Sequence, residues 1–151
     1  MISQKQIKAD LTIHWMIVGM MLIMLVAYHV ICYTVGTDIR INLPEEQRIF
    51  IRSILYVITI ILFPLINLLR HILLRLNQTM PGDTSAKNRY LMTTVITLAS
   101  IETVGMFGFI MFMLGDEINS LYIFSLLGVL GLFLHRPREQ EYRGIIEALK
   151  K

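Results

Sequence analysis

Four long apolar segments separated by short polar stretches constrain the fold of this chain more than any other feature of its sequence. They run from about Leu11 to Tyr33, Ile51 to Leu69, Tyr90 to Leu114 and Ile118 to Leu134. At about 1.5 Å of rise per residue, the first three are comfortably long for a hydrocarbon core of roughly 30 Å, and the fourth is at the lower limit. The sequence therefore predicts an all-α integral membrane four-helix bundle.

The composition favours lipid over water as the surroundings of most of this chain. Of its 151 residues, 55% are hydrophobic and only 17% are charged, whereas a soluble domain carries about 25% charged residues. One small core cannot hide that much apolar surface. The net charge of +3 is small and the basic residues form no stripe with interleaved aromatics, so we expect no nucleic-acid partner. The single cysteine, Cys32, excludes an internal disulfide and a cysteine-based metal cluster.

The basic residues predict the orientation of the four segments. Eleven of the 14 lysines and arginines flank the two ends of the chain or the loop at residues 76–88, while Arg40, Arg48 and Arg52 lie on the opposite side. Lysine and arginine concentrate on the cytoplasmic side of a membrane. We therefore expect both termini in the cytoplasm of a bacterium and the chain in its inner membrane.

Residues 136–151, after the fourth segment, are predicted to form a cytoplasmic amphipathic tail. Tyr142, Ile145, Ile146 and Leu149 recur at helical spacing and share one face. We expect a short helix that lies on the membrane surface or on a partner protein. The alternative is a frayed charged tail.

Glu102 is the most informative single residue, because it places a carboxyl group in the middle of the third segment. It lies 13 residues after Arg89 and 14 before Asp116, and a carboxylate at that depth is usually paired, protonated or functional. We expect it to be buried and mostly protonated. Ala99 and Gly105 beside it let another helix approach, and this least bulky segment is predicted to be the interior one. Three roles stay open: a hydrogen bond between helices, the handling of protons or other ions, and a ligand contact.

The run from Glu102 to Phe109 reads E-T-V-G-M-F-G-F, with a glycine six residues after the carboxylate and directly after an aromatic residue. This run resembles the ion-carrying helix of the proteolipid c-subunits of rotary ATPases. The resemblance implies that Glu102 is an ion-binding carboxylate. It covers about eight residues, and the other segments lack the glycine-rich repeats of that family.

The E-x-x-G-x-F-G pattern of the third segment, the H-R-P-R exit from the fourth and the amphipathic tail together resemble a group of small four-helix bacterial membrane proteins without a known activity. This resemblance implies the four-helix topology and the importance of Glu102. It implies nothing about mechanism.

Two histidines are candidate haem ligands. A haem in a bundle needs two axial histidines at one depth on facing helices, and His14 can meet that condition with His135 or with His71. The tripeptide I-H-W around His14 resembles the first helix of the prokaryotic cytochrome b561 family, which implies an axial role for His14 with His135 as its mate. Arg52 and Leu121 stand where that family has further ligands, so the pattern allows one haem b at most. Histidines that reach toward lipid headgroups are the alternative.

Asn67, Arg70 and His71 lie at the cytoplasmic end of the second segment. Polar and basic side chains just inside the interface can hold a lipid headgroup. We therefore predict a lipid contact at these three residues.

The chain carries no catalytic motif of the H-E-x-x-H, G-x-S-x-G or P-loop kind, so we expect no enzymatic activity, no catalytic residue and no metal site. Its small size, short loops and tail favour a subunit or accessory protein of a larger membrane complex, with proton or ion handling at Glu102. The alternatives are a single-haem b-type cytochrome subunit for electron transfer, through His14 and His135, and a proteolipid-like ion-translocating subunit. The expected partners are membrane lipids and other membrane subunits or further copies of the chain.

Overall fold

Residues 4–150 are described by the computed structural model, and within this range the regular structure is entirely helical. The helices are α1 (Gln4–Thr34), α2 (Gly36–Ile39), α3 (Glu45–Thr79), α4 (Ala86–Met113), α5 (Ile118–Leu134) and α6 (Glu139–Ala148). The all-α prediction is confirmed for this part of the chain. Lys151, at the end of the predicted tail, lies outside the described residues.

Within residues 4–150, α1, α3 and α4 are each long and apolar enough to cross a membrane. The 17-residue α5 meets the same test only when it is joined to α6, from which it is bent by 46°. Large apolar side chains stay exposed on these helices, such as Met16, Ile60 and Leu126 at 69%, 72% and 70%. A continuous apolar exterior of this kind suits lipid rather than water.

The helices extend beyond the apolar segments at their polar ends. α3 begins at Glu45, directly after Pro44, where the missing N–H of proline costs nothing. It ends at Thr79 and therefore continues well past Leu69. α4 ends at Met113, and the chain then turns through Gly115, whose φ of 98° suits glycine.

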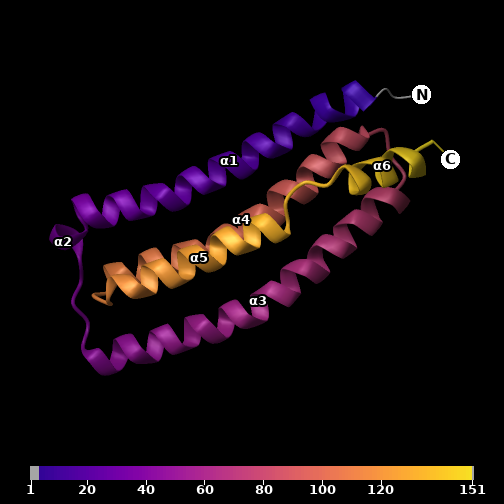
Figure 1. Ribbon diagram of the computed structural model, residues 1–151. Coiled ribbons are helices and arrows are strands. Elements are labelled where there is room, and N and C mark those ends of the chain that lie inside the picture. Colours follow the sequence, from indigo (N-terminus) through magenta and orange to yellow (C-terminus); the bar gives the residue numbers. More distant parts are fainter. Residues whose placement is uncertain (1–3, 151) are drawn as a thin grey trace.

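α4 is the central helix, as expected from its small side chains. It contacts α1, α3, α5 and α6, and α1 and α3 lie on opposite sides of the α4–α5 hairpin (Figure 1). The two helices of the hairpin pack closely, because Gly108 has no side chain. A side-chain carbon at this position would lie 3.1 Å from the Leu121 backbone. The buried hydroxyls of Thr93, Thr94 and Thr97 each donate to the backbone carbonyl four residues earlier, so they enter the core without unpaired donors.

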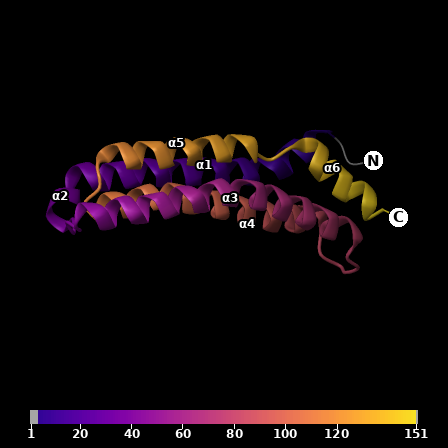
Figure 2. The ribbon, with the colours of Figure 1, turned by 90° about the horizontal axis from the view of Figure 1, so that it is seen from below.

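The molecule has two distinct ends. The N-terminal start of α1, the loop between α3 and α4, and α6 lie together at one end, here called the terminal end (Figure 2). α2 and the turn between α4 and α5 lie at the other, here called the α2 end (Figure 1). The basic residues near the chain ends therefore gather at the terminal end.

Candidate functional site

Glu102 lies in the middle of α4, within the membrane-spanning part of the molecule. Both of its carboxyl oxygens are buried, and neither has a hydrogen-bond partner among residues 4–150. The hydroxyl of Tyr28 in α1 lies close enough to interact with this carboxyl group, but the two groups do not meet the distance and angle criteria of a formed hydrogen bond. The Tyr28 ring stacks on the ring of Phe109 in α4, with 5.3 Å between the ring centroids.

Small residues bring α1 and α5 close to α4 one turn beyond Glu102. A side-chain carbon at Gly105 would overlap the Leu25 side chain of α1. A side-chain carbon at Gly128 of α5 would lie 3.5 Å from the same leucine and 3.6 Å from the Gly105 backbone nitrogen. The three helices therefore meet beside the carboxyl group, and Gly105 permits the close approach that the sequence predicted.

This environment decides which form of Glu102 is the cheaper one. An ionised carboxylate without a paired cation or hydrogen bond costs several kcal/mol in an apolar medium. No basic side chain within residues 4–150 forms an ion pair with Glu102. The arrangement therefore favours the neutral form of this carboxyl group.

A network of polar side chains at the terminal end holds α6 against α3 and α4. Arg70 forms an ion pair of 2.6 Å with Glu141 and donates to the His135 carbonyl at 3.0 Å. The Tyr90 hydroxyl donates to Glu141 at 2.9 Å and accepts the Arg138 backbone N–H at 2.8 Å. This network could not be predicted from the sequence, because its members are distant along the chain.

The apolar face of α6 packs on the chain itself. Tyr142, Ile145 and Ile146 are buried against a cluster that includes Ile7 and Leu11 of α1. The expected short helix is present, and its apolar face contacts its own chain; that α6 also lies on the membrane surface or on a partner stays a prediction. The helical period showed that one face needs cover, but it could not show that α1, α3 and α4 supply that cover.

His14 is fully buried inside this aromatic part of the terminal end. Its Nδ1 donates to the Asp10 carbonyl at 3.1 Å, and its Nε2 has no partner within residues 4–150. Its ring centroid lies 4.9 Å from that of Tyr90 and 6.4 Å from that of Tyr142.

Tyr142 itself is buried, and its hydroxyl donates a hydrogen bond to the Asp10 carboxylate. Burial is the larger cause and the hydrogen bond the smaller one, and together they raise the pKa of Tyr142 to about 12.

His135, the predicted mate of His14 in a haem site, caps α5. Its Nδ1 donates to the Gly131 carbonyl at 3.0 Å, and burial lowers the pKa of this imidazole. The free Nε2 of His14 has the chemistry of a ligand atom, and the rings of Tyr90 and Tyr142 pack near the His14 ring. Haem ligation by the two histidines stays a prediction, which the presence of a Soret band would decide.

The three residues of the predicted lipid contact, Asn67, Arg70 and His71, differ in their exposure in the structure. Asn67 and His71 are exposed, so their lipid contact stays a prediction. Arg70 instead points inward, with only 6% of its side chain exposed. A buried guanidinium needs a counter-ion and acceptors, and Glu141 with the carbonyls at the end of α5 supplies them.

A second ion-pair network, which the sequence did not predict, closes the α2 end. Asp116 in the α4–α5 turn is buried and pairs with Arg52 at 3.0 Å, and it accepts from the Ser120 hydroxyl at 2.5 Å. Arg48 donates to the Gly115 carbonyl at 2.5 Å, and Arg40 donates to the Asp116 carbonyl. All three arginines of this side are therefore used to fasten the turn.

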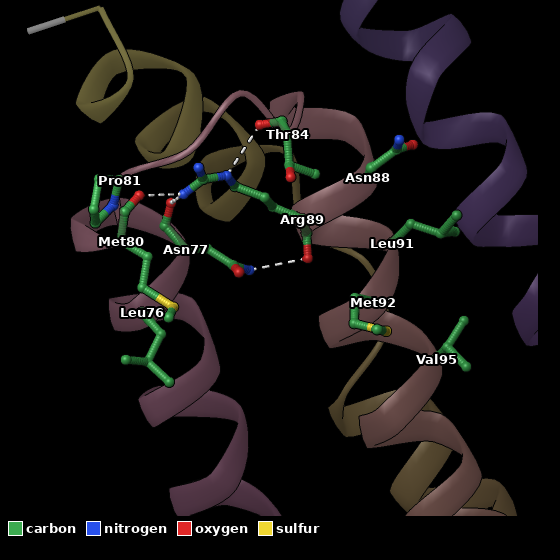
Figure 3. Close-up of a pocket in the computed structure, with 10 residues that line it drawn as sticks. All are labelled: Leu76, Asn77, Met80, Pro81, Thr84, Asn88, Arg89, Leu91, Met92 and Val95. Carbon is green, nitrogen blue, oxygen red and sulfur yellow. Dashed lines mark hydrogen bonds between the residues drawn. The ribbon is translucent and has the colours of Figure 1, made fainter.

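A cavity of about 540 Å³ lies between the adjoining ends of α3 and α4. Figure 3 shows the Arg89 guanidinium in its wall, turned toward the carbonyls of the connecting loop. Arg89 donates to the carbonyls of Thr84, Asn77, Met80 and Gly82 at 2.7 to 3.1 Å. Its donors are therefore occupied by the loop, which gives it a structural role at the end of α3.

Comparison of the chain with protein-family models, with curated proteins and with solved structures found no match. Among the buried polar atoms without a partner in residues 4–150, the only acidic ones belong to Glu102. Glu102 is therefore the candidate functional residue.

Proposed function

We propose that this protein is a four-span subunit or accessory protein of a larger complex in the bacterial inner membrane, and that Glu102 takes up and releases a proton there. The observation that carries the proposal is the buried carboxyl group of Glu102, whose two oxygens have no partner within residues 4–150. Asp116 and Glu141, by contrast, each pair with an arginine. A carboxyl group left unpaired at this depth is costly, and such residues commonly mark proton and ion pathways.

The proposed topology has both termini in the cytoplasm. In support, the start of α1, the α3–α4 loop and α6 share the terminal end (Figure 1), where most basic residues lie, and basic residues favour the cytoplasmic side. α5 is the fourth span in this proposal, and α6 stays at the cytoplasmic face. The exposed apolar sides of α1 and α3 are covered by lipid or by neighbouring subunits.

In the proposed mechanism, Glu102 is neutral at rest and ionises transiently. The Tyr28 hydroxyl already interacts with this carboxyl group, so a small movement of α1 lets it donate a full hydrogen bond to the new carboxylate. A donor on a neighbouring subunit completes the stabilisation. The close contact of Leu25 with Gly105 couples such a movement of α1 to the helix that carries the carboxyl group.

The Glu102→Gln variant tests this function, because glutamine keeps the hydrogen-bonding capacity but cannot titrate. We expect the variant to insert and assemble normally, to lose proton flux in proteoliposomes that contain the purified complex, and to lose the infrared band of a protonated carboxyl group. Ser125→Ala is the matched control, since Ser125 also has a buried, unpartnered side-chain oxygen but no titratable group. Wild-type flux in Glu102→Gln would leave Glu102 only a structural role between helices.

A further inference from the structure

Two neighbouring cavities on the outside of the molecule share Trp15 of α1. The first, of about 380 Å³, lies between α1 and α5, and its wall is apolar apart from Arg136. The second, of about 420 Å³, includes Lys8, Thr12 and Glu139 in its wall. We call the two together the Trp15 groove. It is distinct from the cavity beside Arg89 and from the predicted contact at Asn67 and His71.

The Trp15 groove changes from polar to apolar along the direction of the membrane normal. Lys8, Trp15 and Leu22 are seven residues apart and so share one face of α1. Lys8 and Leu22 are separated by about 21 Å of helix rise. The polar cavity therefore lies at the terminal end, and the apolar cavity extends from there into the span. This is the order of groups in a phospholipid, with its headgroup at the interface and its acyl chains below.

The basic residues of the Trp15 groove lack acidic partners within the described part of the chain. Lys8 is exposed and belongs to none of the ion pairs there. The Arg136 guanidinium lies over the Phe133 ring at 4.4 Å and donates to the Phe133 carbonyl at 3.1 Å, which holds it at the mouth of the apolar cavity. Glu139, the acidic residue in the wall, is already paired with Arg143 at 2.5 Å. The groove therefore presents two uncompensated positive charges.

We propose that the Trp15 groove binds one anionic phospholipid, with an acyl chain along the apolar cavity between α1 and α5 and its phosphate held by Lys8 and Arg136. A zwitterionic lipid fits the apolar cavity equally well, so the two basic residues supply the preference. Trp15 joins the two cavities, as an amphipathic ring does at the level of the headgroups. Arg89 does not provide an equivalent site, because its donors are occupied by loop carbonyls.

Trp15 is the single tryptophan of the chain, so its fluorescence reports on this groove alone. The experiment reconstitutes the full chain in vesicles of phosphatidylcholine and phosphatidylglycerol, with bromine atoms on the acyl chains of one lipid at a time. Bromine quenches a tryptophan that it contacts. The dependence of quenching on mole fraction then gives the association constant of each lipid at the Trp15 groove relative to the other.

We expect the anionic lipid to bind at Trp15 about 25 times more strongly than the zwitterionic one, since Lys8 and Arg136 are each worth about fivefold near the surface. Lys8→Gln and Arg136→Gln should each lower this ratio several-fold, and the double variant should bring it close to one. The matched control is the double variant Arg75→Gln with Lys150→Gln, which removes the same charge from the terminal end outside the groove. This control should leave the ratio of the two association constants unchanged.

Three results would overturn the proposal. The first is a wild-type ratio near one. The second is an unchanged ratio in the double variant. The third is an equal loss in the double variant and in the Arg75 and Lys150 control, because that result assigns the preference to overall surface charge. Lys8 is exposed, so its single variant keeps the test valid if Arg136→Gln disturbs the end of α5.

Discussion

Glu141→Ala is expected to loosen α6 from the rest of the molecule. The Glu141 carboxylate accepts from Arg70 at 2.6 Å and from the Tyr90 hydroxyl at 2.9 Å. The Arg70 side chain is only 6% exposed. Without Glu141 its guanidinium has no counter-ion, and only the carbonyls of His135 and Arg136 remain as acceptors. The penalty therefore comes mainly from a charge that stays buried and unpaired.

The size of this penalty follows from the burial of the pair. Removing one partner of a fully buried ion pair costs about 3–5 kcal/mol, and water reaches the 19% of the Glu141 side chain that is exposed. We therefore expect Glu141→Ala to lower the free energy of opening α6 by about 2–3 kcal/mol. Glu141→Gln should cost roughly half as much, because the amide oxygen still accepts from Tyr90 but no longer compensates the charge of Arg70.

Hydrogen exchange of the α6 amides in detergent micelles measures this free energy directly. Glu139→Ala is the matched control on the same helix, since its ion pair with Arg143 is exposed at 34% and 43% of the side chains. Such a surface pair is worth about 0.5 kcal/mol or less. An equal loss of protection at Tyr142 and Ile145 in both variants would refute the role given to the Arg70 pair.

Two further predictions concern packing and pH. Gly105→Val should destabilise the chain by about 1–3 kcal/mol, because its side chain overlaps Leu25; thermal unfolding in detergent should show partial recovery when Leu25→Ala is added, and no recovery would contradict the contact. Burial lowers the pKa of His135 below its ordinary 6.5, so the unfolded chain binds this proton more tightly. The contribution of neutral His135 to stability is therefore complete above about pH 6.5 and is lost as the pH falls from there through the lowered pKa. As the pH is lowered from about 8 to about 5, the melting temperature of the wild type should fall relative to that of His135→Gln. A difference in melting temperature that does not change with pH would contradict this role of His135.

The positions of the main helices could be predicted because contact with lipid is a local demand on composition. Each predicted apolar segment lies in a helix of the structure, except for Leu114, which caps α4. The ends differ most for α3, which runs from Glu45 to Thr79. Apolar runs mark the part of a helix that lipid can cover, whereas a helix continues for as long as its polar ends find packing partners, as α3 does against α6.

The sequence by itself determined that Glu102 lies at the middle of an apolar helix, that Gly105 lets a neighbour approach it, and that residues after the fourth segment have one apolar face. Only the tertiary structure decided that the Glu102 oxygens stay unpartnered, that α6 covers its own chain and that Arg70 turns inward to Glu141. Depth and periodicity are properties of one helix and can be read along it. Partners are not, because Arg70 and Glu141 are 71 positions apart, and only the packing of all the helices brings them together.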